Sequence, residues 1–233
     1  MIEGWLTAKE GNVLYELAKN CSVDGVIVEV GSWKGKSTIC LAKGSIAGNR
    51  MKIFAVDPHT GSAEHRKHGT VNTLAEFKRN IRQAEVQHII TPLVMTSEQA
   101  AEKFPMPVGL LFVDGSHDYA DVKKDFDCWI SRVIPNGIVA FHDSVKWSGV
   151  RKVVDELVYN SNRFRHIRLI NSMTIAEKVY GNNFCERMQN RTGLLQKKVI
   201  ELVEAVALIV LNVAGVLFEA LMNLVGIKAE TKL

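Results

Sequence analysis

Residues that could bind a ligand follow short apolar runs of this chain. Segment 29–37 reads Glu-Val-Gly-Ser-Trp-Lys-Gly-Lys-Ser after one run, and Asp57 follows the next. Two glycines permit a tight turn, and the free N–H groups where Ser37 opens a helix favour a carboxylate or phosphate. An acidic side chain about 20 residues further on can accept hydrogen bonds from a ribose diol. These residues favour a nucleoside-containing ligand, although segment 29–37 alone could be a purely structural turn.

A second group of polar residues follows two later apolar runs. Asp114 comes after one run, and His142 and Asp143 come after the next. His117 lies three residues beyond Asp114, so both side chains could face one cleft. Because imidazole titrates near neutrality, His117 could accept a proton there. It could instead cap the helix that we expect near Ala120, or contact the ligand.

The elements that position these groups are predicted from hydrophobic patterning. Continuous apolar runs suit strands buried on both faces, and the segments between them are long enough for crossover helices. The expected strands are Val26–Val30, Ile53–Val56, His88–Val94, Leu110–Val113 and Ile138–Phe141. The expected helices are Thr7–Asn20, Ser37–Ala42, Thr73–Ala84, Ser97–Lys103, Ala120–Val133 and Val150–Tyr159. The first of them opens with a capping-box pattern at Thr7 and Glu10. This pattern predicts a doubly wound α/β sheet, in which ligands bind beyond the carboxyl ends of the strands.

Two further short segments predict how the sheet ends. Arg165–Leu169 and Met173–Lys178 are separated by a short turn, which is typical of an antiparallel hairpin at a sheet edge. We therefore expect a mostly parallel, seven-stranded sheet. Breaks at 181–183 and 190–193 predict a domain over residues 1–181 and a linker over 182–193.

The remaining residues, 194–233, differ in character and predict an added hydrophobic C-terminal helix. Residues 205–218 carry no charge, and apolar side chains occur on every face of the expected helix. The 4-3 spacing of Leu195, Val199 and Leu202 is typical of a packed helix pair. We expect a homo-oligomer through residues 194–227, with membrane contact or folding back on the domain as alternatives.

Composition limits the class of protein. The 233 residues include 29 Lys+Arg and 25 Asp+Glu, and the small net charge of +4 gives no argument for nucleic acid. The four cysteines are far apart, and no signal-peptide segment opens the chain. We expect a cytoplasmic protein that could associate with a membrane.

Two long motifs resemble those of class I S-adenosylmethionine-dependent methyltransferases. The first is segment 28–37 followed by Ile53–Asp57. The second runs from Phe112-Val113-Asp114-Gly115-Ser116-His117 to Phe141-His142-Asp143. The resemblance is to the small-domain O-methyltransferases, many of which modify sugars, and it covers about residues 1–180. It implies a Rossmann-like fold and S-adenosylmethionine as cofactor.

Carried onto this sequence, the resemblance implies a set of cofactor-binding residues. It places the methionine carboxylate of the cofactor near Gly31 and Ser37, the ribose on Asp57 and the adenine beside Ser97. Ser97 could instead be an ordinary helix N-cap. The whole predicted cofactor-binding set is Glu29, Gly31, Ser32, Gly35, Ser37, Asp57, Ser97 and Asp114.

The resemblance also implies a divalent cation, magnesium or manganese, bound by Asp114, His142 and Asp143. His142 stands where members of the family often have a second carboxylate, and an imidazole ligand suits manganese or iron better than magnesium. His117 is the predicted catalytic base, since a hydroxyl acceptor must lose its proton. Trp147 could present an aromatic surface to the substrate, or it could have a packing role in the core. His59, His65 and His68 lie in a polar segment that could cover the cleft, although we expect most of them to be solvated loop residues.

The sequence thus predicts an O-methyltransferase that acts on a hydroxyl of a sugar or another small molecule. A non-catalytic cofactor-binding module of the same fold, oligomeric or membrane-tethered, is the alternative. A nicotinamide-dependent oxidoreductase is disfavoured because segment 29–37 lacks the GxGxxG spacing.

Overall fold

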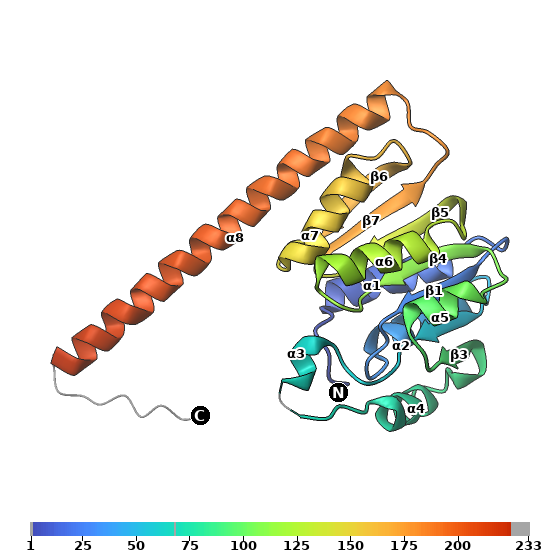
Figure 1. The fold of residues 1–233 in the computed structure, drawn as a ribbon, viewed down its shortest axis with the longest axis horizontal. Coiled ribbons are helices and arrows are strands. Elements are labelled where there is room, and N and C mark those ends of the chain that lie inside the picture. Colours follow the sequence, from blue (N-terminus) through green and yellow to red (C-terminus); the bar gives the residue numbers. More distant parts are fainter. Residues whose placement is uncertain (1, 68, 225–233) are drawn as a thin grey trace. The chain divides into compact units, whose positions relative to one another are not determined.

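The computed structural model describes residues 2–67 and 69–224, and the chain divides into two compact units, Met1–Gly193 and Leu194–Leu233. The first unit is built around a seven-stranded sheet in the order β3-β2-β1-β4-β5-β7-β6 (Figure 1). The strands are β1 Val26–Val30, β2 Ile53–Val56, β3 Ile90–Leu93, β4 Val108–Val113, β5 Val133–Phe141, β6 Phe164–Ile170 and β7 Met173–Lys178.

The strand directions confirm the predicted fold. β1 to β5 are parallel, whereas β7 is antiparallel to both β5 and β6. The sheet is therefore mostly parallel and Rossmann-like, with an antiparallel C-terminal hairpin. Because β1, β2, β4 and β5 are parallel neighbours, the residues that follow them gather at one edge of the sheet.

Helices cover both faces of the sheet because strand side chains alternate between the faces. The helices are α1 Ala8–Lys19, α2 Lys36–Ala47, α3 Ala63–Arg66, α4 Leu74–Gln83, α5 Ser97–Glu102, α6 Tyr119–Trp129 and α7 Ser148–Val154. A π-helical turn follows α7 at Asp155–Tyr159. Ile27 and Leu110 point to the face where Leu14, Leu41 and Phe77 of α1, α2 and α4 pack in one buried cluster.

The opposite face packs against α6. The ring of Phe126 lies 6.2 Å from that of Phe141 on β5, and the rings of Trp129 and Phe54 both pack edge-on against Phe104. Several boundaries differ from the expected ones: α2 continues to Ala47, β3 is shorter than expected, and β5 begins at Val133, where we expected a helix to end. Val133 pairs with Val108 of β4, so the pairing of these strands begins earlier than the apolar run indicates.

The C-terminal helix α8 spans Phe184–Leu224 (Figure 1). Residues from 184 onward in the expected linker are therefore helical. Large apolar side chains of the second unit, including Leu202, Leu208 and Leu211, are exposed. Within residues 2–67 and 69–224, no helix has both the length and the apolar character that crossing a bilayer requires. The last residues of the expected self-association segment, 225–227, lie outside the described part of the chain.

Candidate active site

The loop between β1 and α2 turns at two glycines in the left-handed region. Gly31 has a φ of 87°, and a Cβ atom there would lie 2.2 Å from the carbonyl oxygen of Asp114, so no larger residue fits. Gly35 has a φ of 88° and stands directly before α2. The close approach at Gly31 puts this loop against the end of β4.

Asp57, at the end of β2, holds the loop in place. Its Oδ2 accepts hydrogen bonds from the N–H groups of Ser32 and Trp33, at 2.9 and 2.8 Å. Its Oδ1 accepts the N–H of His59 at 2.6 Å. A carboxylate offers about four acceptor positions, so these three bonds leave room for one ribose hydroxyl. Ribose binding by Asp57 stays a prediction.

Glu29 lies beneath the same loop and is buried. Its carboxyl accepts a hydrogen bond from the hydroxyl of Thr38 in the first turn of α2. Burial raises the pKa of Glu29 to about 8, even though the hydrogen bonds from Ser37 and Thr38 act in the opposite direction. Glu29 therefore stabilises the start of α2 through Thr38. A direct contact between Glu29 and a cofactor stays a prediction.

Ser97 follows β3, but it is not the N-cap of α5. Thr96 is the N-cap: its backbone is extended, and it forms a capping box with Gln99. The alternative interpretation of Ser97 as a cap is therefore wrong. Ser97 Oγ instead accepts a hydrogen bond from Trp129 Nε1 at 2.9 Å, which leaves its adenine role as a prediction.

Asp114, His142 and Asp143 come together at the ends of β4 and β5. His142 Nδ1 lies 3.1 Å from Asp114 Oδ1 and 3.2 Å from Asp143 Oδ2. One ligand atom from each residue lies within 4.8 Å of the others. The grouping arises because β4 and β5 are adjacent and parallel, so both end at the same edge.

The chemistry of this cluster fits a divalent cation. Both ring nitrogens of His142 are buried, and neither makes a hydrogen bond within the described part of the chain. Neighbouring ligands of a cation held at about 2.1 Å are about 3 Å apart, which matches the spacing of His142 Nδ1 from its two carboxylate oxygens. Two carboxylates and an imidazole would accept manganese or iron more readily than magnesium.

The cluster also favours a protonated imidazole. Burial opposes the charge on His142, but the carboxylates of Asp114, Asp143 and Glu10 outweigh it and raise its pKa to about 12. The same contacts affect Asp143. Burial raises the pKa of this carboxyl, but His117 and His142 outweigh burial and hold the pKa well below its usual range. A proton and a metal ion are therefore alternative sources of positive charge between these carboxylates.

Glu10 of α1 belongs to the same cluster, and the sequence did not indicate it as a site residue. Its Oε2 lies 3.4 Å from His142 Nε2, and both side chains are buried. The capping box predicted for Thr7 and Glu10 is confirmed. The capping pattern gave no sign that this carboxylate reaches the end of β5, because that contact depends on how α1 packs on the sheet.

His117 lies beside Asp143, as expected from its position after β4. Its Nε2 is 3.3 Å from Asp143 Oδ2, and its Nδ1 is 3.0 Å from Glu64 Oε2 of α3. Burial acts against the imidazolium, but the two carboxylates raise the pKa of His117. Trp147 stacks on the imidazole at 4.1 Å between centroids and 10° between planes. Because Trp147 is partly exposed, it forms a wall beside His117 and is not buried in the core.

The polar segment after β2 contributes a buried histidine. We expected most histidines of this segment to be solvated, but His59 is buried, and its Nδ1 lies 2.9 Å from Thr73 Oγ1. Its ring also packs against Phe77 of α4. His59 is thus an exception to the expected solvation, which stays a prediction for the other two histidines. His65 falls in α3 and its side chain is not described, while His68 lies outside the described residues.

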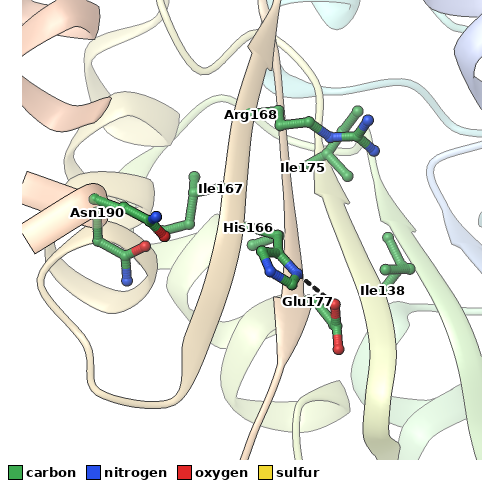
Figure 2. A pocket seen from close by; sticks show the side chains of 9 residues that line it. Ile138, His166, Ile167, Arg168, Ile175, Glu177 and Asn190 are labelled. Carbon is green, nitrogen blue, oxygen red and sulfur yellow. Dashed lines mark hydrogen bonds and ion pairs between the residues drawn. The ribbon is translucent and has the colours of Figure 1, made fainter. Parts of the chain in front are cut away.

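A cavity of about 560 Å³ lies elsewhere, along β6 and β7 (Figure 2). Its lining includes Ile138, Arg168 and the pair His166 and Glu177, whose Nδ1 and Oε2 are 2.8 Å apart. None of the predicted site residues lines it. The candidate site is thus at the carboxyl ends of the strands, not in this cavity.

The model of a methyltransferase domain family matches residues 28–144, which span both halves of the site. The chain belongs to this methyltransferase domain family. The predicted resemblance is thereby confirmed, and the chain falls in the methyltransferase class of enzymes.

Curated relatives of this methyltransferase domain are uncharacterised proteins. One, y4gI of Sinorhizobium fredii, is 32% identical over 128 residues, which are 51% of this chain and 13% of that protein. Another, R132 of Acanthamoeba polyphaga mimivirus, is 28% identical over 164 residues, or 63% of this chain and 67% of that protein. The chain thus spans a small part of the first relative and about two thirds of the second.

Solved structures share the fold of this methyltransferase domain at low identity. The O-methyltransferase NovP has a TM-score of 0.63 at 17% identity, covering 73% of this chain and 80% of that one. An O-methyltransferase of Bacillus cereus in complex with SAH has a TM-score of 0.54 at 17% identity, covering 75% and 82%. An rRNA methylase of Streptococcus thermophilus has a TM-score of 0.53 at 12% identity, covering 76% and 99%. Because such different methyltransferases share the fold, the fold alone does not identify the acceptor.

Proposed function

We propose that the protein is an S-adenosylmethionine-dependent O-methyltransferase that acts on a hydroxyl of a sugar or another small molecule with the help of a divalent cation. The observation that carries the proposal is the gathering of Asp114, His117, His142 and Asp143 beside the loop that Asp57 holds. The similar B. cereus structure, described as a complex with SAH, supports S-adenosylmethionine as the cofactor.

The reaction requires alignment and one proton transfer. An oxygen–carbon bond forms as the carbon–sulfur bond of the sulfonium breaks, its electron pair remains on sulfur, and the acceptor hydroxyl loses its proton. In this proposal the cofactor is bound by Asp57 and by the loop from Gly31 to Ser37. The acceptor is bound at the cluster of Asp114, His142 and Asp143. A cation bound by Asp114, His142 and Asp143 supplies Lewis acidity that makes a hydroxyl easier to deprotonate.

His117 is the proposed base, and its surroundings identify the nitrogen that acts. A proton on Nδ1 is held by Glu64 at 3.0 Å, the shorter of the two carboxylate contacts. His117 acts as a base in its neutral form, in which Nε2, 3.3 Å from Asp143 Oδ2, carries no proton, and we place the acceptor hydroxyl beside that nitrogen. Stacking on Trp147 fixes the plane of the ring. His117 Nε2 would accept the hydroxyl proton as the oxygen attacks.

The test is methyl transfer from labelled S-adenosylmethionine to a panel of sugars and other polyhydroxylated acceptors. We expect label in at least one acceptor, loss of transfer in excess EDTA, and recovery with Mn²⁺ or Mg²⁺. Full transfer in EDTA would remove the cation from the proposal. Failure of the protein to bind S-adenosylmethionine or S-adenosylhomocysteine in calorimetry would overturn the function itself.

We further propose that residues 194–227 mediate self-association. The support is the series of exposed apolar side chains along α8, among them Leu195, Leu202, Ile209 and Val213, which water solvates poorly. Deletion of residues 194–233 should lower the mass seen by light scattering. An unchanged mass together with lost binding to liposomes would favour membrane contact instead.

A further inference from the structure

The carboxylate of Glu10 is buried in α1 and held by four hydrogen bonds. Its Oε1 accepts the N–H and the hydroxyl of Ser172, at 3.1 and 2.9 Å. Its Oε2 accepts the N–H and the hydroxyl of Thr7, at 3.0 and 2.7 Å. These donors come from the start of α1 and from the turn between β6 and β7, so the carboxylate is fixed from two sides.

The oxygen that binds Thr7 also faces His142. Glu10 Oε2 lies 3.4 Å from His142 Nε2. The His142 ring points toward α1 because side chains two residues apart in a strand lie on the same face of the sheet. Ala140, two residues earlier on β5, belongs to the buried cluster that includes α1 residues. The end of β5 is tied to the same turn, since the N–H and hydroxyl of Ser144 both donate to the carbonyl oxygen of Ser172 at 2.8 Å.

Helix capping alone does not require this arrangement. A capping box needs the Glu10 carboxylate only near the N–H of Thr7, a position that is often exposed to water. Burying a carboxylate is costly unless a charged or hydrogen-bonding partner compensates for lost hydration. The donors from Thr7 and Ser172 compensate in part, and His142 adds a partner that helix capping does not need, so the cluster at the end of β5 contributes to the burial of Glu10.

We propose that Glu10 is a positioning residue that orients His142 as a metal ligand. With the cation bound, it would accept a hydrogen bond from Nε2–H, which lies 3.4 Å from Glu10 Oε2 in this structure, and so keep the lone pair of Nδ1 directed toward Asp114 and Asp143. Histidine ligands of metal ions commonly donate their second ring N–H to a carboxylate, which fixes the tautomer and the ring orientation. The inference rests on the cation-assisted function proposed above and adds α1 to the machinery of that site.

The test measures cation binding directly. Mn²⁺ is titrated into the protein and followed by electron paramagnetic resonance, for wild type, Glu10→Gln, Glu10→Ala and Glu16→Gly. Loss of a carboxylate that orients a metal-binding histidine typically weakens metal affinity about 10- to 100-fold. We expect that loss in Glu10→Ala and a smaller one in Glu10→Gln, whose amide oxygen can still accept the hydrogen bond.

Glu16→Gly is the matched control. Glu16 is an exposed residue of the same helix, and glycine there destabilises the helix but leaves the Glu10 carboxylate and its partners in place. The variant should therefore lower the melting temperature and leave Mn²⁺ affinity within about 3-fold. If Glu10→Ala does not fold, the comparison of Glu10→Gln with Glu16→Gly decides. A Glu16→Gly variant that loses as much Mn²⁺ affinity as the Glu10 variants would overturn the inference, because helix stability would then explain the effect.

Nitrogen-15 NMR of histidine-labelled protein loaded with Zn²⁺ gives a second readout. We expect a metal-bound Nδ1 and a protonated, slowly exchanging Nε2 at His142 in wild type, and fast exchange at Nε2 in Glu10→Ala. An unchanged spectrum and unchanged Mn²⁺ affinity in Glu10→Ala would contradict the proposal.

Binding of S-adenosylhomocysteine, measured on the same samples, separates this inference from the proposed function. Wild type that binds S-adenosylhomocysteine but no Mn²⁺ would overturn the inference together with cation assistance, and would leave the methyltransferase proposal standing. Wild type that binds Mn²⁺ in a Glu10-dependent way but no S-adenosylhomocysteine would support the inference and overturn the methyltransferase proposal.

Discussion

The β1–α2 loop and the cluster at the ends of β4 and β5 lie at the same sheet edge, but they are built differently. The loop is held mainly by neutral backbone N–H groups of Ser32 and Trp33 that donate to one carboxylate, Asp57, on the next strand along the chain. The cluster is held by carboxylates and imidazoles that face each other, and Glu10, Glu64 and Asp143 come from distant parts of the chain.

This difference predicts different sensitivities. A loop supported by backbone hydrogen bonds binds a cofactor through its shape, so substitutions there should change affinity. A cluster of charged groups provides chemistry, so substitution of His117, which is not among the predicted cofactor-binding residues, should change turnover while cofactor affinity remains. The following experiments measure turnover, cofactor affinity and stability in variants of the two regions.

The largest expected effect is in the cluster. His117→Ala removes the proposed base, and loss of a general base typically lowers turnover by about 10²- to 10⁴-fold. Affinity for S-adenosylhomocysteine should stay within about 3-fold, because His117 belongs to the acceptor side. Steady-state kinetics with labelled cofactor and calorimetry measure the two quantities. His166→Ala is the matched control, since His166 also pairs with a carboxylate, that of Glu177, but lies on β6. Equal loss of turnover in both variants would refute the assignment.

A smaller effect is expected in the loop. Asp57→Ala removes an ionised hydrogen-bond acceptor, worth about 1.5–3 kcal/mol, and should weaken cofactor binding roughly 10- to 100-fold. The loss has two sources, the ribose contact and the release of the backbone at Ser32 and Trp33. Calorimetry with S-adenosylhomocysteine measures it, with the exposed Asp24, which pairs only with nearby Ser22 among the described hydrogen bonds, changed to Ala as control. Unchanged affinity in Asp57→Ala would remove Asp57 from the cofactor site.

The last effect is a change in stability with pH at Glu29, and it is at most about 1.4 kcal/mol for each pH unit. Folding keeps the proton on Glu29 up to a pKa of about 8, whereas the unfolded chain releases it near 4.5. The folded state therefore binds more protons between these values, and the contribution of Glu29 to the free energy of unfolding falls as pH rises from about 4.5 to about 8, by at most about 1.4 kcal/mol per pH unit.

Glu29→Gln should remove this slope, because the amide does not titrate. The measurement is urea unfolding of wild type and variant at several pH values, and the difference between the two curves isolates Glu29. The exposed Glu102, changed to Gln, should leave the wild-type slope in place. A difference between wild type and Glu29→Gln that does not vary with pH would show that Glu29 is ionised in the folded protein.

Sequence alone determined the elements and the edge where the site lies. Apolar runs located the parallel strands, and the residues after them, Gly31, Asp57, Asp114 and Asp143, could be named because strand ends meet at one edge of such a sheet. These features depend on neighbours in the chain, so local patterns record them.

Only the tertiary structure decided which side chains complete the cluster. Glu10 and Glu64 reach His142 and His117 across long sequence separations, because α1 packs on the sheet face that His142 shares and α3 brings a carboxylate to the end of β4. The burial of His59 and the stacking of Trp147 on His117 were decided in the same way. Such contacts are set by packing between elements, and no spacing within a single helix or strand records them.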